Sequence, residues 1–301
     1  MNKSGKPKAG KQIFILSALG ALLVLAIVSA GCIDEISPLP DEVKVRGNVL
    51  SVDPKLIPSE TIVAFLLHPN DYVKEAFEAV DKYLPADDPV IEIGAGPGTV
   101  GAYINKRLQI KTDHVSLESN PYLLPLLEKT KATNELGIRY VNGVIAYGVD
   151  TVPVQVTKNY LESNIAPTKN EETVDVPAYT LREIVDNSDF VDKGGVTVFI
   201  EVDGIWNDIL KNEPNLGDFV STLIVATWNI SKNDREVLFK KVHNAGLVNS
   251  FTSDTGKDGL IVFVFKRYES KRDSSLPANS AGTNSTGGAE VPSGSTPADS
   301  A

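Results

Sequence analysis

Three glycines, Gly94, Gly96 and Gly98, are the residues best placed to take part in ligand chemistry. They follow a short apolar run, Val90–Ile93, that predicts a buried strand, and they precede a predicted helix over Thr99–Leu108. Glycine permits the positive φ angles of a tight turn and lets a ligand approach the backbone closely. The first N–H groups of a helix are unpaired and carry positive potential, so the turn is typical of a ligand-binding loop.

Two carboxylates accompany this glycine loop. Glu92 lies two positions before Gly94, and Glu118 ends the next predicted strand, His114–Glu118. A carboxylate at that strand end can accept hydrogen bonds from both ribose hydroxyls of a nucleoside cofactor. A dinucleotide-binding loop needs GxGxxG, and Thr99 stands where its last glycine is required. The GxGxG spacing instead resembles the first motif of class I S-adenosylmethionine-dependent methyltransferases. A dinucleotide enzyme and a purely structural glycine turn are the alternatives.

Three later segments extend this resemblance. Leu117–Pro121 (LESNP) is an acidic turn followed by Asn-Pro, Val174–Leu181 (VDVPAYTL) is a small strand before a helix, and Phe199–Gly204 reads FIEVDG. In this order they resemble segments of the FkbM-type methyltransferases, which are mostly O-methyltransferases of sugars and other small natural products. The last segment is similar to that family's KIDVEG block.

The resemblance spans about residues 70–267 and implies a Rossmann-like class I methyltransferase fold with S-adenosylmethionine as cofactor. It also implies a sugar-like or other hydroxylated small molecule as methyl acceptor. The chain departs from the family where Gly96 replaces an Asn of the glycine loop and where Phe199 replaces the Lys of the KIDVEG block. The residues that the resemblance places at the cofactor are Glu92, Gly94, Ala95, Gly96, Gly98, Glu118, Ser119 and Asn142.

The FIEVDG segment carries two candidate catalytic acids, Glu201 and Asp203, exchanged relative to the family's Asp and Glu. They end a predicted strand over Val196–Val202, where open α/β sheets bind ligands. Alternation along a strand places both on one side, where each carboxylate raises the pKa of the other. We expect Asp203 to be the substrate-facing acid or base and Glu201 to lie near the cofactor's amino group. Alternatively, one of them only caps the turn at Gly204.

Four aromatic or histidine residues are weaker candidates. His68 could fold over the site as a base, although a surface position is the more common case, and His243 fits a structural or exposed position. Trp206 and Trp228 follow predicted strand ends and could line an acceptor pocket or pack in the core. The three histidines lie far apart and show no metal-ligand spacing, so no metal site is expected.

Strands alternate with helices along most of the chain. This pattern predicts an α/β fold with a mostly parallel sheet, and the closing hairpin adds one antiparallel strand. The predicted helices are Asp71–Leu84, Thr99–Leu108, Tyr122–Asn134, Thr180–Asp186 and Asp234–Ala245. The predicted strands are Val90–Ile93, His114–Glu118, Ile138–Val141, Val196–Val202, Leu223–Thr227, Leu247–Ser253 and Leu260–Arg267.

The net charge limits the expected partners, and the N-terminal segment predicts attachment to a membrane. The net charge of −10 disfavours binding to phosphate backbones, so no nucleic-acid partner is expected. Four lysines precede the apolar run Ile13–Gly31, which is long enough for a transmembrane helix and also has the form of a signal peptide. Ser29–Cys32 (SAGC) resembles a lipoprotein processing box, which would make Cys32 a lipidation site. Each reading sends the rest of the chain to the extracytoplasmic side.

The expected organisation has four parts: a signal or membrane anchor (1–32), an N-terminal extension (33–69), a methyltransferase-like domain (70–268) and a tail (269–301). The tail is rich in Ser, Thr, Pro and Gly, which is typical of disorder. The leading hypothesis is a membrane-anchored O-methyltransferase. The alternative is an exported surface lipoprotein that uses the same fold as a binding or structural module without catalysis.

Overall fold

The computed structural model describes residues 39–156, 164–165, 173–190, 193–228, 230–253 and 259–268. The chain divides into two compact units, Met1–Arg267 and Tyr268–Ala301, and every element described below belongs to the first. The predicted leader (1–32) and the predicted disordered tail (269–301) lie outside the described residues. Among the residues described, none of the helices is both long and apolar enough to cross a membrane.

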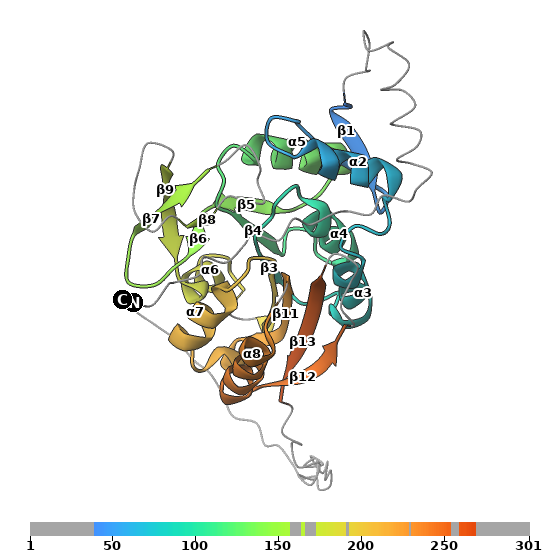
Figure 1. Cartoon of the computed structure of the whole chain (residues 1–301). Coiled ribbons are helices and arrows are strands. Elements are labelled where there is room, and N and C mark those ends of the chain that lie inside the picture. The colour runs from blue at the N-terminus through green and yellow to red at the C-terminus, as the bar shows by residue number, and fades with distance from the viewer. Residues whose placement is uncertain are drawn as a thin grey trace, which may run out of the picture. The chain divides into compact units, whose positions relative to one another are not determined.

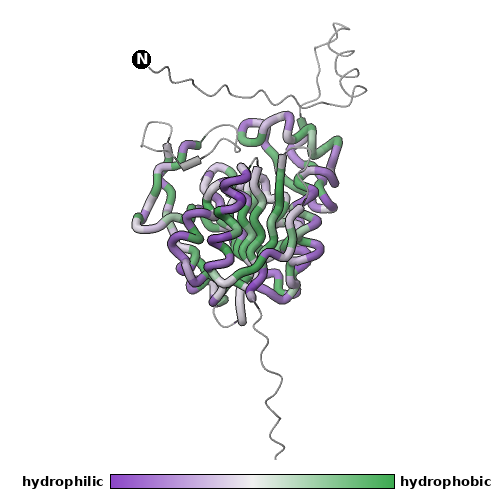
Figure 2. Tube along the Cα trace, turned by 60° about the horizontal axis from the view of Figure 1, so that its bottom comes forward, coloured by the Kyte–Doolittle hydropathy of each residue, from purple (hydrophilic) through white to green (hydrophobic). Residues whose placement is uncertain are grey.

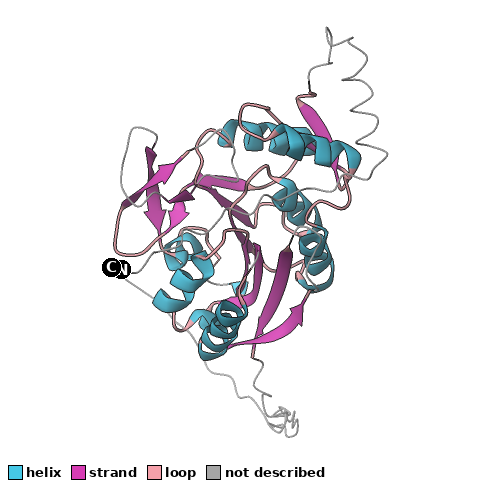
Figure 3. Ribbon diagram, in the orientation of Figure 1, coloured by secondary structure: helices cyan, strands magenta, loops and turns pink. Residues whose placement is uncertain are grey.

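A seven-stranded sheet forms the centre of the first unit, in the order β12-β13-β11-β10-β3-β4-β5 (Figures 1 and 3). The five strands from β11 to β5 are parallel, and β13 runs antiparallel to both β11 and β12. This is the Rossmann-like α/β fold with a reversed strand near the C-terminus, as predicted. The strands are β3 (Val90–Ile93), β4 (His114–Glu118), β5 (Arg139–Asn142), β10 (Val196–Ile200), β11 (Val220–Trp228), β12 (Leu247–Thr252) and β13 (Leu260–Arg267).

Helices cover both faces of this sheet, which explains why every residue of the central strands β3, β4 and β10 is buried (Figure 2). On β10, Phe199 packs into one core, whereas Val198 and Ile200 pack into the other. The first core is covered by α3 (Lys74–Tyr83), α4 (Thr99–Arg107) and α5 (Leu124–Asn134). The second is covered by α6 (Leu181–Asp186), α7 (Ile205–Asn212) and α8 (Lys232–Asn244), with a short 3-10 turn, η3 (Leu216–Asp218).

A hairpin and a helix at the start of the described chain complete the first core. They are β1 (Glu42–Val45), β2 (Asn48–Ser51) and α2 (Ser59–Leu67), and Figure 1 shows them beside α5. Asn134 of α5 bonds both backbone groups of Val49, because its Oδ1 accepts from the N–H at 2.9 Å and its Nδ2 donates to the carbonyl at 2.6 Å. The hairpin is therefore anchored directly to α5.

A second, four-stranded sheet follows β5, in the order β6-β9-β7-β8. It has a small core of its own, formed by Val144, Val154 and Val176. The ring of Tyr179 lies where a Cβ on Gly143 would stand, so glycine at this position allows the small sheet to pack against the end of β5. Its strands are β6 (Val144–Ile145), β7 (Thr151–Gln155), β8 (Asn164–Ile165) and β9 (Thr173–Tyr179).

Most predicted elements are confirmed to within a few residues, and β3, β4 and β13 are confirmed at both ends. One strand was predicted too long: β10 ends at Ile200, and the chain bends at Val202 instead of continuing as a strand to that residue. Two of the described helices were not predicted: α2, and α7, which begins immediately after Gly204.

Candidate active site

The glycine loop connects β3 to α4, and all three of its glycines have positive φ, at 94° for Gly94, 50° for Gly96 and 80° for Gly98. Internal packing already requires glycine at two of these positions. A Cβ on Gly94 would lie 2.6 Å from Cγ2 of Val202, and one on Gly98 would lie 2.8 Å from Cδ2 of Leu127. The loop is thus pressed against the segment after β10 on one side and against α5 on the other.

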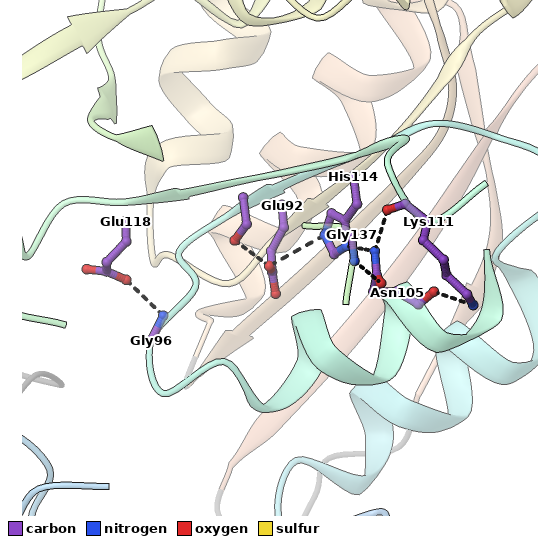
Figure 4. Close-up of polar contacts among 8 residues, drawn as sticks. Glu92, Gly96, Asn105, Lys111, His114, Glu118 and Gly137 are labelled. Atoms are coloured by element: carbon purple, nitrogen blue, oxygen red, sulfur yellow. Dashed lines mark hydrogen bonds and ion pairs between the residues drawn. The ribbon is translucent and has the colours of Figure 1, made fainter. Parts of the chain in front are cut away.

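Glu118 holds the glycine loop to the turn after β4 (Figure 4). Its Oε2 accepts from the N–H of Gly96 at 2.8 Å, and its Oε1 accepts from the N–H of Asn120 at 2.7 Å. Burial raises the pKa of this carboxyl to about 7; the two backbone hydrogen bonds lower it, and the nearby Glu92 raises it further. Glu118 is therefore a buried acid that titrates near neutral pH.

Asn142, the last residue of β5, also holds the turn after β4. Its Nδ2 donates to the backbone carbonyls of Glu118 at 2.8 Å and Ser119 at 3.3 Å. The structure thus brings together four of the residues predicted at the cofactor: Gly96, Glu118, Ser119 and Asn142. Ala95, also predicted there, is buried in the first core next to the loop.

The side chain of Glu92 points into the first core, beneath α4. Its Oε2 accepts from Oγ of Ser116 at 2.5 Å and lies 3.6 Å from Nε2 of His114 (Figure 4). A Cβ on Gly101 of α4 would lie 2.5 Å from the same Oε2, so this second glycine makes room for the carboxylate. Glu92 is fully buried beneath the first turn of α4, and its influence on a ligand would be electrostatic.

A polar network not foreseen from the sequence surrounds His114. Asn105 of α4 lies at its centre: Nδ2 donates to the carbonyl of Lys111 at 2.7 Å and lies 3.5 Å from Nδ1 of His114. Oδ1 of Asn105 accepts from the N–H of Gly137 at 3.0 Å (Figure 4). The network ties α4 to the loops that precede β4 and β5 and supports the site from within the fold.

Glu201 is the first residue after β10 and its backbone lies against Gly94, since its carbonyl carbon is 3.5 Å from the position of a Cβ there. The side chain is half-buried, and among the described residues its carboxylate has no hydrogen-bond partner. Burial raises the pKa of Glu201 well above its usual range, and the charge of Glu92 adds to this rise.

Asp203 is placed differently from the prediction. Its Oδ1 accepts from Oγ1 of Thr227 at 2.6 Å and from the N–H of Trp228 at 3.1 Å, both at the end of β11. The expectation that Glu201 and Asp203 share one side of a strand is wrong, because the strand ends at Ile200. Asp203 instead bridges from its own bend to the neighbouring strand.

The weaker candidates lie outside the site or in the core. His68 is exposed, with Nδ1 3.9 Å from a carboxylate oxygen of Asp71, and His243 is exposed on α8. Trp206 is buried in the second core, and Trp228 packs half-buried against the first.

A cavity of about 200 Å³ lies at the opposite end of the sheet. It is lined by residues that precede the parallel strands β10 and β11, among them Gly195 and Phe219. The glycine loop follows the other, carboxyl end of β3. The cavity is therefore separate from the carboxylates described above.

Comparison with known proteins finds no matching family model and no matching curated protein. Solved structures do match. A ribosomal protein L11 methylase from Lactobacillus delbrueckii subsp. bulgaricus is 10% identical, with a TM-score of 0.41 over 64% of this chain and 76% of that one. A precorrin-6y C5,15-methyltransferase from Geobacter metallireducens GS-15 is 13% identical, with a TM-score of 0.39 over 73% and 94%. M. capricolum TrmK, solved with S-adenosyl-homocysteine, is 14% identical, with a TM-score of 0.40 over 64% and 67%.

At these identities and TM-scores the likeness assigns the chain to no family. The fold is defined by the strand order and by the reversed strand β13.

Proposed function

We propose that this chain binds S-adenosylmethionine and transfers its methyl group to a hydroxyl of a small molecule. The observation that carries the proposal is the position of Glu118, a buried carboxylate at the carboxyl end of β4 that already contacts the glycine loop through Gly96. Ribose hydroxyls of a nucleoside that enters between β3 and β4 would meet this carboxylate. The N–H of Asn120 donates to this carboxylate, and Asn142 holds the backbone carbonyl of the same residue.

The charge of the site favours this cofactor over a dinucleotide. Glu118 and Glu201 lie at the ends of β4 and β10 on either side of the loop, and Glu92 lies beneath it. A pyrophosphate would meet these carboxylates, and the N–H of Gly96 that could bind it already donates to Glu118. S-adenosylmethionine carries a sulfonium and an amino group, whose positive charges carboxylates stabilise.

S-adenosylmethionine supplies an electrophilic methyl group when bound. The chain must hold the acceptor oxygen in line with that methyl group and remove the hydroxyl proton, and orientation alone can supply much of the rate. Glu201, which follows the central strand β10, is the candidate for contact with the cofactor, whereas the carboxylate of Asp203 is bonded to Thr227 and Trp228 of β11. The proposed acceptor, a sugar-like or other hydroxylated molecule, rests on the resemblance of the sequence segments.

We further propose that the N-terminal leader tethers this domain to a membrane, with the domain on the extracytoplasmic side. This proposal rests on the basic start of the chain and its apolar run, Ile13–Gly31.

Binding to the full-length chain tests the cofactor assignment. Calorimetry should show binding of S-adenosylmethionine and S-adenosylhomocysteine. Glu118→Gln should weaken both by about tenfold or more, because a hydrogen bond to a charged group contributes about 1.5–3 kcal/mol. Glu128→Gln is the matched control: this exposed carboxylate of α5 forms an ion pair with Lys131, its one ion pair within the described part of the chain, so its loss should leave affinity unchanged. Binding of NAD without binding of either methionine-derived ligand would overturn the proposal.

A further inference from the structure

We infer that Asp203 is a positioning residue that clamps the bend after β10 to the end of β11, and that Glu201 is the carboxylate left free to meet the positive charge of the ligand. The inference rests on the proposed function for its second half. The clamp itself depends only on the fold.

The contacts of Asp203 define the clamp. One carboxylate oxygen, Oδ1, accepts from Oγ1 of Thr227 at 2.6 Å and from the N–H of Trp228 at 3.1 Å. Both donors belong to the last two residues of β11, the strand that pairs in parallel with β10. Protonation of the carboxylate would weaken these two charge-assisted hydrogen bonds, so taking a proton from a substrate would loosen the bend.

The clamp acts on the glycine loop through the residue between the two acids. Val202 lies in the bend that Asp203 holds, and its Cγ2 lies 2.6 Å from the position that a Cβ on Gly94 would take. A fixed bend therefore keeps Val202 seated on Gly94 and keeps the backbone of Glu201 beside the loop. Asp203 thus shapes the site without touching the ligand.

Glu201 differs from Asp203 in its hydrogen bonds. Among the described residues its carboxylate accepts no hydrogen bond, although it is half-buried. It continues the face of β10 that carries Phe199, and Phe199 pairs with Glu92 on β3. Glu92 adds negative charge behind Glu201 and so increases the attraction for a cationic ligand at this position. A half-buried, unpaired carboxylate beside another acid is costly to keep charged unless a cation arrives.

Four variants of the full-length chain separate positioning from ligand contact: Asp203→Asn, Asp203→Ala, Thr227→Val and Glu201→Gln. For each, the thermal midpoint of unfolding and the affinities for S-adenosylmethionine and S-adenosylhomocysteine are measured. Asparagine keeps an oxygen that accepts from Thr227 and Trp228, so Asp203→Asn should keep affinity within about threefold. Asp203→Ala should lower the midpoint by about 2–4 °C per lost hydrogen bond and weaken both ligands severalfold.

Thr227→Val removes one donor of the clamp while keeping the shape of the side chain. It should lower the midpoint in the wild-type background but have little effect in Asp203→Ala, because the two side chains share one interaction. Glu201→Gln should show the contrary pattern, with a midpoint that is unchanged or higher at pH 8 and an affinity for S-adenosylmethionine about tenfold lower.

Distinct outcomes overturn each part. If Asp203→Asn loses affinity as severely as Asp203→Ala while keeping its midpoint, then the charge of Asp203 contacts the ligand and the positioning role is wrong. Additive losses of the midpoint from Thr227→Val and Asp203→Ala would contradict the clamp, because they would show that the two side chains do not share an interaction. An unchanged affinity of Glu201→Gln for S-adenosylmethionine would contradict the proposed contact of Glu201 with the ligand. If the wild-type chain binds neither ligand, the proposed function fails, and the midpoints alone still decide the clamp.

Discussion

At the scale of single residues, the site is defined by buried and half-buried acids that have no lysine or arginine partner among the described residues. Both carboxylate oxygens of Glu118 accept from backbone N–H groups, and one oxygen of Glu92 accepts from Ser116. The carboxylate of Glu201 has no hydrogen-bond partner among the described residues. Burial and the nearby Glu92 raise the pKa of both Glu118 and Glu201, so these two acids favour the protonated form when no cation is near. A cationic ligand reverses this preference, which links ligand binding to pH.

Stability should therefore fall as pH rises through neutrality. The pKa of Glu118 is raised from 4.5 to about 7, so its protonated form stabilises the fold fully below pH 4.5, and this contribution is lost as pH rises through 7. The loss is on the order of 3 kcal/mol in the free energy of unfolding, at about 1.4 kcal/mol per pKa unit. Glu118→Gln, which resembles the protonated acid, should show a smaller decrease in denaturation midpoint between pH 5.5 and pH 8.

S-adenosylmethionine should stabilise the wild type more at pH 8 than at pH 5.5, because a cation favours the charged carboxylates. Equal pH dependence in the wild type and Glu118→Gln would show that Glu118 does not titrate in this range.

At the scale of elements, the site lies where two loops meet, one after β3 and one after β10. They meet where Cγ2 of Val202 lies 2.6 Å from the position that a Cβ on Gly94 would take. This contact explains why glycine is required at Gly94 before any ligand is considered, since its φ is +94° and a side chain there would overlap Val202.

Gly94→Ala should lower the free energy of unfolding by about 2–5 kcal/mol, because overlap costs about 1–3 kcal/mol and the left-handed backbone about 1–2 kcal/mol. Gly148→Ala is the control, since Gly148 has φ of +75° with open space around its Cβ position, so only the backbone cost of about 1–2 kcal/mol applies. Combining Gly94→Ala with Val202→Ala should restore part of the loss in urea denaturation. A double variant no more stable than Gly94→Ala would show that the contact with Val202 is not the cause.

The elements also show where sequence patterns sufficed and where they did not. The strand-glycine-helix unit around Gly94 was predicted closely because its signals are local. Helix α7 was missed although Ile205, Trp206, Ile209 and Leu210 share one apolar face, a helical spacing that could have revealed it. The end of β10 was missed because the β-branched run continues to Val202, whereas the bend there comes from Asp203 reaching the neighbouring strand.

At the scale of the whole molecule, the folded domain follows an apolar leader that lies outside the described residues. Under the proposed membrane attachment, Cys32 in the SAGC segment would be the lipidation site, or Ile13–Gly31 would span the membrane. Cys32→Ser should release the chain from membranes into the soluble fraction after cell fractionation if Cys32 is lipidated after cleavage. A variant that stays in the membrane at full length would instead identify Ile13–Gly31 as an uncleaved anchor.

The sequence by itself determined the α/β class, the parallel sheet with its reversed strand, the glycine loop and the place of Glu118. These features follow from hydrophobic periodicity and turn residues, which act over a few positions along the chain. Only the tertiary structure decided which way Glu92 points, that β1 and β2 dock on Asn134, and that Asp203 bonds to β11. Those contacts join residues 24 to 85 positions apart in the sequence, so they depend on strand order and register and leave no local pattern.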